Sequence, residues 1–129
     1  MSIASDLRTV LTQFGGLTSL VSTRVSPYLR NRDDPFPGIT FEIATEELNT
    51  DAAGTTTTSQ AEGEITVHAR TFTEAETIGA QVLAAIAADS EQGVIKHIRP
   101  VSVSRTYEDP YDGSSDLVYR WALTCQIKG

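Results

Sequence analysis

Leu-Val-Tyr-Arg-Trp-Ala-Leu-Thr-Cys-Gln-Ile occupies residues 117–127, and every second residue in it is apolar. A period of two is typical of a β-strand with one buried face. That face would carry the apolar series Leu117, Tyr119, Trp121, Leu123, Cys125 and Ile127. Residues 107–116 come just before and contain Asp-Pro and Asp-Gly pairs, which favour a turn. The two segments predict a final hairpin that ends in a half-buried strand.

Other strands are expected upstream. Residues 39–48 and 64–70 also alternate, and we expect them to pair antiparallel. Residues 101–107 predict a third strand, which Pro100 should limit at its start. Residues 49–60 lack a large apolar side chain and contain five threonines, so we expect either a polar ribbon beyond the core or a partly disordered segment. In the free subunit we expect this segment to have low order.

The N-terminal segment has the apolar spacing of a helix. Residues 3–14 predict about three amphipathic turns, with Ser2 as the N-cap and Gly15-Gly16 at the end. One further helical turn could start at Thr18. Residues 25–29 are then expected to be extended, before a loop with two prolines.

The strongest helical pattern covers residues 73–88. Thr73 and Glu76 have the spacing of a capping box. The apolar side chains that this helix would bury include Ile78, Val82, Leu83 and Ile86. Burying each one should contribute roughly 1.5–3 kcal/mol relative to exposure, so this helix would form the main cover of the sheet.

The predicted elements follow the order α-β-β-α-β-β. This order indicates an α+β fold, in which two main helices pack on one face of an antiparallel-rich, four-stranded sheet. Residues 1–129 show no repeat and no linker, so we expect one domain. The lone cysteine, the absence of a signal-like start and the lack of an apolar run of about 20 residues predict a soluble intracellular protein.

Charge is distributed unevenly along the chain. The formal net charge of −7 argues against nucleic acid as a primary ligand, because such binding depends on cationic side chains. No Lys or Arg lies among the acidic residues of the middle segment, which are Glu42, Glu46, Glu47, Asp51, Glu62 and Glu64. The first quarter instead contains Arg8, Arg24, Arg30 and Arg32. Either these charges form an ordinary solvated surface, or they form complementary surfaces on copies of the same chain.

Residues with chemical potential are few and scattered. His68 and His97 do not have the spacing of metal ligands. Cys125 lies on the inward face of the last strand, where a thiol behaves as a small hydrophobic group. Gly15-Gly16 lacks the lysine of a phosphate-binding loop. We therefore predict no catalytic, cofactor-binding or metal-binding residue, and a protein that is not an enzyme.

The order of the segments resembles a known family. The N-terminal helix leads through residues 17–27 to Pro-Gly-Ile-Thr-Phe at 37–41, and the strand at 65–70 precedes the helix that begins with Thr-Glu-Ala-Glu. Asp-Pro-Tyr-Asp-Gly at 109–113 comes before the last strand. This arrangement is similar to that of the tail completion, or tail terminator, proteins of long-tailed bacteriophages and prophages.

The resemblance implies a non-enzymatic virion protein without a cofactor or membrane contact. Such proteins form a ring, typically a hexamer, on the head-proximal end of the tail tube, where they end tube polymerisation and provide the head-joining surface. The implied partners are further copies, the major tail tube protein and a head-completion protein, and DNA passes through the lumen without specific binding. The implied location is the virion tail, after assembly in the host cytoplasm.

Candidate subunit or partner contacts come from the charged segments and the acidic turn. They are Arg24, Arg30, Arg32, Glu42, Glu46, Glu47, Asp51, Glu62, Glu64, Asp109, Tyr111, Asp112 and Asp116. Two alternatives remain open: an adaptor of the head-to-tail connector, and a small α+β ligand-binding domain or enzyme. An apolar pocket with converging polar groups would favour the last of these.

Overall fold

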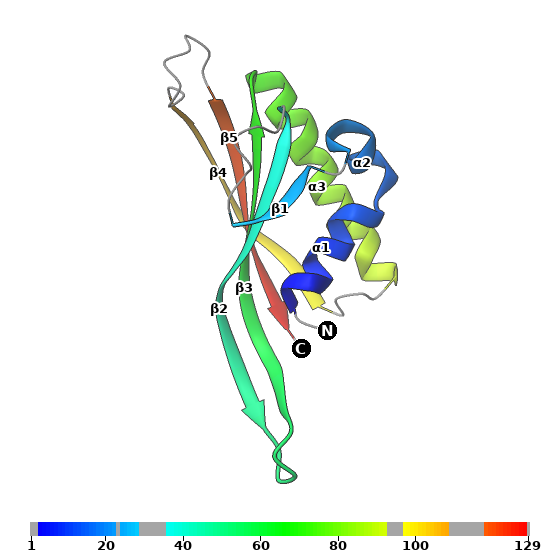
Figure 1. Cartoon of the computed structure of the whole chain (residues 1–129), viewed down its shortest axis with the longest axis vertical. Helices are drawn as coiled ribbons and strands as arrows, with labels where there is room; N and C mark the ends of the chain where they lie inside the picture. Colours follow the sequence, from blue (N-terminus) through cyan, green and yellow to red (C-terminus); the bar gives the residue numbers. More distant parts are fainter. Residues whose placement is uncertain (1–2, 23, 29–35, 93–96, 109–117, 129) are drawn as a thin grey trace.

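The computed structural model describes residues 3–22, 24–28, 36–92, 97–108 and 118–128. These residues form the following elements: α1 (Ile3–Gln13), α2 (Gly15–Val21), β1 (Val25–Pro27), β2 (Gly38–Thr50), β3 (Thr56–Ala69), α3 (Phe72–Gln92), β4 (His97–Glu108) and β5 (Val118–Lys128). Figure 1 shows the helices gathered on one face of a twisted sheet, from which the far end of β2 and β3 projects. The predicted α+β class and the placement of helices on one face are confirmed.

The sheet has five strands in the order β1-β2-β3-β5-β4. β2 and β3 pair antiparallel as predicted, and so do β3 with β5 and β4 with β5, whereas β1 runs parallel to β2. The predicted four strands and the order α-β-β-α-β-β are therefore wrong, because they omit β1 and α2. Three residues are too few to show a period, and β1 is held through its backbone: Ile39 N donates to Arg24 O and Tyr28 N to Phe41 O, each at 2.9 Å.

β5 lies between β3 and β4, so its position inside the sheet explains its apolar alternation. Trp121, Leu123, Cys125 and Ile127 are buried and Tyr119 is half-buried, as the period of two predicts. Leu117 and the turn at residues 109–116 lie outside the described residues. The strand that ends the chain is therefore central to the core.

Helix α3 covers the sheet, but its buried face differs from the predicted one. Ile78, Val82 and Ile86 are buried, and Ala85 joins them. Leu83 is 37% exposed, so its predicted burial is wrong. The reason is geometric: the buried positions are spaced by three or four residues, and position 83 lies at the border of the stripe that they define.

The two ends of α3 also differ from the prediction. Thr71, not Thr73, provides the cap: its hydroxyl accepts from the backbone N–H of Glu74 at 3.1 Å, and the Glu74 carboxylate accepts from the N–H of Arg70 at 3.4 Å. This cap lies two residues upstream of the predicted capping box and differs from it in one bond, because the carboxylate accepts from the residue before the cap and not from Thr71 itself. At the other end, the helix continues past Ala88 to Gln92.

The glycine pair that was expected to end the first helix also begins the second. Helix α1 ends at Gln13, and α2 begins at Gly15 instead of Thr18. Phe14 between them is extended, and its carbonyl accepts from the N–H groups of Leu17 and Thr18 at 3.1 Å. The break therefore lies at Phe14.

The polar segment between β2 and β3 forms a β-hairpin. β2 extends to Thr50 and β3 begins at Thr56, so both strands are longer than predicted. At the turn, the Asp51 carboxylate accepts from the N–H groups of Ala53 and Thr55 at 2.9 Å, and Gly54 has a φ of +86°, which glycine adopts without strain. Of the two structures expected for residues 49–60, the ribbon is the one present.

Strand β4 begins four residues earlier than predicted, at His97, and contains Pro100. Because β4 is the last strand of the sheet, a proline there removes no hydrogen bond to a neighbour on its outer side. The register with β5 shifts between Pro100 and Ser102, which is a β-bulge. The expectation that Pro100 limits the strand is therefore wrong.

Candidate assembly surface

The face of the sheet opposite the helices is polar. In β3 the buried residues alternate from Ala61 to Ala69, so Glu62, Glu64 and Thr66 point to the other face. Across the strands, Glu64 lies opposite both Glu42 of β2 and Thr124 of β5. Figure 1 shows no helix over this face in the described part of the chain. The uncovered face is therefore open to a partner.

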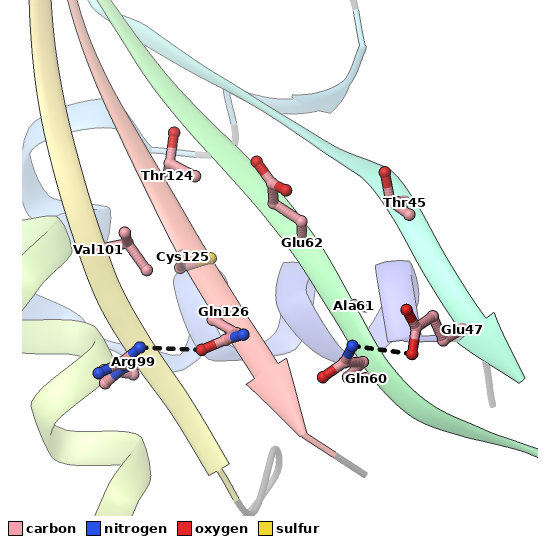
Figure 2. Close-up of a pocket in the computed structure, with 10 residues that line it drawn as sticks. All are labelled: Thr45, Glu47, Gln60, Ala61, Glu62, Arg99, Val101, Thr124, Cys125 and Gln126. Atoms are coloured by element: carbon pink, nitrogen blue, oxygen red, sulfur yellow. Dashed lines mark hydrogen bonds between the residues drawn. The ribbon is translucent and has the colours of Figure 1, made fainter.

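A shallow depression of about 380 Å³ lies on this face (Figure 2). It is lined by Thr45, Glu47, Gln60, Ala61, Glu62, Arg99, Val101, Thr124, Cys125 and Gln126. Two hydrogen bonds cross it: Arg99 Nη2 donates to Gln126 Oε1 at 2.9 Å, and Gln60 Nε2 donates to Glu47 Oε2 at 2.8 Å. The depression thus presents paired polar side chains between strands, and Glu47 and Arg99 lie on its two sides.

The cysteine at this depression is a buried thiol. Cys125 is buried, and burial raises the pKa of its thiol to about 11. The thiol donates to the Gly63 carbonyl at 3.5 Å. A thiol with this pKa carries almost no thiolate at neutral pH. In the described ranges, no group of three or more His, Cys, Asp and Glu side chains is placed to hold a metal, and no helix is long and apolar enough to cross a membrane.

The charges of the sheet divide between its two halves. The charged side chains of β2 and β3 are all acidic, namely Glu42, Glu46, Glu47, Glu62 and Glu64. Those of β4 and β5 are Arg99, Arg105, Arg120 and Lys128, with Glu108 at the very end of β4. The two halves meet where β3 pairs with β5; β4 is the edge strand of the basic half, and β2 lies next to the short edge strand β1.

The far end of the hairpin forms what we call the arm, residues 48–59. β3 pairs with β5 only from Gln60 onward, so within the described chain the arm is a ribbon of two strands. Leu48 is 60% exposed, and Asp51 is exposed at the turn. In Figure 1 the arm extends well beyond the helices. Within the described residues no third strand pairs with the arm, so its edges are available to another molecule.

The structure brings together the acidic residues among the predicted contacts. Glu46, Glu47 and Glu62 are exposed, and Glu42 and Glu64 are half-buried opposite each other. The half-buried Arg24 precedes β1 and donates from Nε to the Pro37 carbonyl, just before β2, at 2.7 Å. Six of the predicted contacts lie outside the described residues: Arg30, Arg32, Asp109, Tyr111, Asp112 and Asp116.

The basic half of the sheet was missed by the sequence analysis. A signal was present, because residues 97–107 and 118–128 contain no acidic residue and several basic ones. One of these, Arg105, is held in place by an ion pair with Glu76 of α3. The hydrogen bond from the Arg105 guanidinium lowers the pKa of the Glu76 carboxyl and raises the pKa of Arg105. The missed residues are the cationic counterpart of the acidic hairpin.

His68 takes part in a row of polar side chains that crosses three strands. His68 is half-buried; its Nε2 lies 3.0 Å from the Thr40 hydroxyl, and Arg120 Nε donates to its Nδ1 at 3.5 Å. Accepting at Nδ1 leaves Nε2 as the donor to Thr40, which is the pattern of a neutral imidazole. This row joins the acidic half to the basic half, and it contains no nucleophile.

Known proteins are similar to this chain along nearly its whole length. Its fold is similar to a chain from the virion of a native gene transfer agent (GTA) particle, with 17% identity, 99% of this chain and 96% of that chain covered, and a TM-score of 0.45. It is also similar to the bacteriophage SPP1 gp17 protein, with 15% identity, 94% and 86% covered, and a TM-score of 0.49. No curated protein matches the sequence. The family model described as "Tail completion protein gp17" matches residues 5–128, and the chain therefore belongs to this family of phage structural proteins.

Proposed function

We propose that copies of this chain form a ring, with six subunits, on the head-proximal end of a viral tail tube. The ring ends polymerisation of the tube and provides the surface to which the head is joined. Its partners are the major tail tube protein on one side and a head-completion protein on the other. The observation that carries the proposal is the match of the tail completion family to residues 5–128.

The division of charge in the sheet supports a ring. A ring that closes requires heterologous contacts, in which one patch on each subunit meets a different patch on the next. The acidic β2 and the basic β4 lie at or near opposite edges of the sheet, so one subunit presents complementary charges in two directions. In this proposal the acidic residues Glu42, Glu46, Glu47, Asp51, Glu62 and Glu64 contribute to contacts between copies.

The overall charge supports passage of DNA through the ring. Each copy carries a formal charge of −7, and phosphates are attracted by cationic side chains, not by carboxylates. DNA therefore passes the ring without specific binding. The acidic turn residues, Asp109 to Asp116, are our candidates for contacts with the tube or the head. The protein resides in the tail of the virion and is assembled in the host cytoplasm.

A tube-capping experiment tests this function. Cognate tail tube subunits are polymerised alone and with increasing amounts of the protein, and tube lengths are measured by negative-stain microscopy. We expect shorter tubes with a ring at one end. Unchanged tube lengths and bare ends would contradict the proposal. Binding to isolated heads with no effect on tubes would instead support a connector adaptor.

A further inference from the structure

We propose that the acidic outer edge of β2, together with the arm, lies against the basic outer edge of β4 on the next copy of this chain. The inference rests on the proposed ring and names the two edges that meet in it. β4 is the last strand of the sheet, so within the described residues its outer edge is unpaired from His97 to Glu108. Unpaired strand edges are prone to pair with another chain.

The second unpaired edge belongs to β2. β1 pairs with β2 only at Ile39, Thr40 and Phe41, so in the described chain the outer side of β2 is open from Glu42 to Thr50. Register shifts occur between Ile43 and Thr45 and between Glu47 and Leu48. Bulges of this kind bend a strand and increase its twist. In Figure 1 the arm extends away from the rest of the sheet, so in the proposed ring it can reach a neighbouring copy.

Charge selects which edges can meet. The open part of β2 carries Glu42, Glu46 and Glu47 and no cation, whereas β4 carries the exposed Arg99 and no acid before its last residue. Arg105 of β4 is already paired with Glu76 of α3, so Arg99 is the cation that the β4 edge offers to a neighbour. Two β2 edges would repel each other, and so would two β4 edges, because like charges across a strand pair are destabilising. Only the contact of β2 with β4 joins opposite charges. That contact is heterologous, so it has the polarity that a closed ring needs.

Each edge also exposes a large apolar side chain. Leu48 at the base of the arm is 60% exposed, and Val101 beside the bulge of β4 is 56% exposed. Val101 borders the depression that Arg99 and Glu47 also line. An arm that lies across the neighbouring β4 would cover Val101 with Leu48 and bring Glu47 of one copy near Arg99 of the next.

Reversal of one charge on each edge tests the proposal. Glu47→Arg and Arg99→Glu are prepared as separate proteins, and their assembly is measured by mass photometry at low and high salt, alone and on cognate tail tubes. Each variant alone places like charges at every interface, so we expect about tenfold weaker association than in the unaltered protein. An equal mixture should recover assembly, because alternating subunits restore opposite charges at every interface. Arg8→Glu, an exposed residue of α1 with the same change in charge, should assemble normally.

The other outcomes are distinct. If the unaltered protein assembles and both variants assemble equally well, the assignment of the two edges is wrong while the ring stands. If the variants fail alone and the mixture also fails, Glu47 and Arg99 do not face each other, which overturns the assignment as well. If no assembly occurs with or without tubes, both the edge assignment and the proposed function are overturned.

Discussion

The two faces of the sheet carry different kinds of side chain. The face under the helices is apolar and closely packed, with Trp121 directly beneath Gly79 of α3. The opposite face presents carboxylates on β2 and β3 and cations such as Arg99 of β4 and Arg120 of β5, whereas Arg105 pairs with Glu76 on the helix side. Packing against the helices accounts for the apolar residues of the first face, whereas the polar residues of the second face bond mainly to one another across neighbouring strands. The difference indicates that stability resides mainly in the covered face, whereas the uncovered face and the sheet edges serve assembly.

The largest change in stability is expected from a substitution where α3 packs on the sheet. Ile78→Ala should lower the free energy of unfolding by about 2–5 kcal/mol, because it removes a buried side chain from a packed core. Leu83→Ala on the same helix should cost less than about 1 kcal/mol, because Leu83 is partly in water. Denaturant unfolding of the two variants measures the difference. Equal losses would show that Leu83 belongs to the core.

A pH effect should come from the buried thiol. Burial raises the pKa of Cys125 to about 11, above its ordinary value of 9.0. The stability that this thiol contributes is therefore fully present below pH 9 and is lost as the pH rises through 11. The loss should amount to about 2–3 kcal/mol, since each pKa unit corresponds to about 1.4 kcal/mol.

Urea unfolding at pH 8 and pH 11, compared with Cys125→Ala, isolates this contribution from other titrating groups. The variant should lose less stability over the same range. If both proteins lose the same free energy of unfolding between pH 8 and pH 11, ionisation of the Cys125 thiol is not the cause of the loss.

A smaller loss of stability is expected from Gly79→Ala, because α3 packs closely on the sheet at this position. A Cβ at Gly79 would lie 2.4 Å from Trp121 Cε2, so Gly79→Ala requires the indole or the helix to shift. Overpacking of this kind costs about 1–3 kcal/mol, partly offset by the higher helix propensity of alanine. Gly15→Ala is the matched control, because a Cβ there meets no atom within 4 Å. Thermal unfolding of both variants checks the contrast, and an unchanged Gly79→Ala protein would show that the indole can move freely.

The smallest change in stability, a gain and not a loss, is expected from a substitution on the uncovered face. Glu42 lies directly opposite Glu64, and like charges in this arrangement repel. Glu64→Gln should therefore stabilise the free subunit by about 0.2–1 kcal/mol, and the gain should shrink in high salt. Melting temperature at two salt concentrations measures it. A lower melting temperature would mean that Glu64 is needed for the fold.

Local sequence patterns were sufficient to predict many of the residues that the helix-covered face of the sheet buries. The alternation of residues 117–127 identified β5 and its buried side chains, because a strand inside a sheet with one polar face must alternate. The apolar spacing of residues 73–88 identified the long helix. It placed Leu83 wrongly, since spacing defines a stripe but not which border of the stripe meets the sheet.

The sequence alone predicted only the acidic half of the candidate assembly surface. The acidic segment from Glu42 to Glu64 stands out along the chain because its members are close in sequence. The basic residues of β4 and β5 are separated in sequence by residues 109–117, so they become a group only when the strands pair. The capping residue Thr71 was missed because two overlapping motifs, Thr71 with Glu74 and Thr73 with Glu76, have the same spacing.

The sequence by itself determined the class of the fold, the inward side of β5, the polar character of the hairpin and the lack of an obvious catalytic motif. These properties depend on side-chain period and composition, which are local. Only the tertiary structure decided that β1 adds a parallel strand and that β5 lies between β3 and β4. It also decided that the acidic strands form one side of the sheet and the basic strands the other. Those features depend on which strands become neighbours, and strand order is a contact between distant parts of the chain.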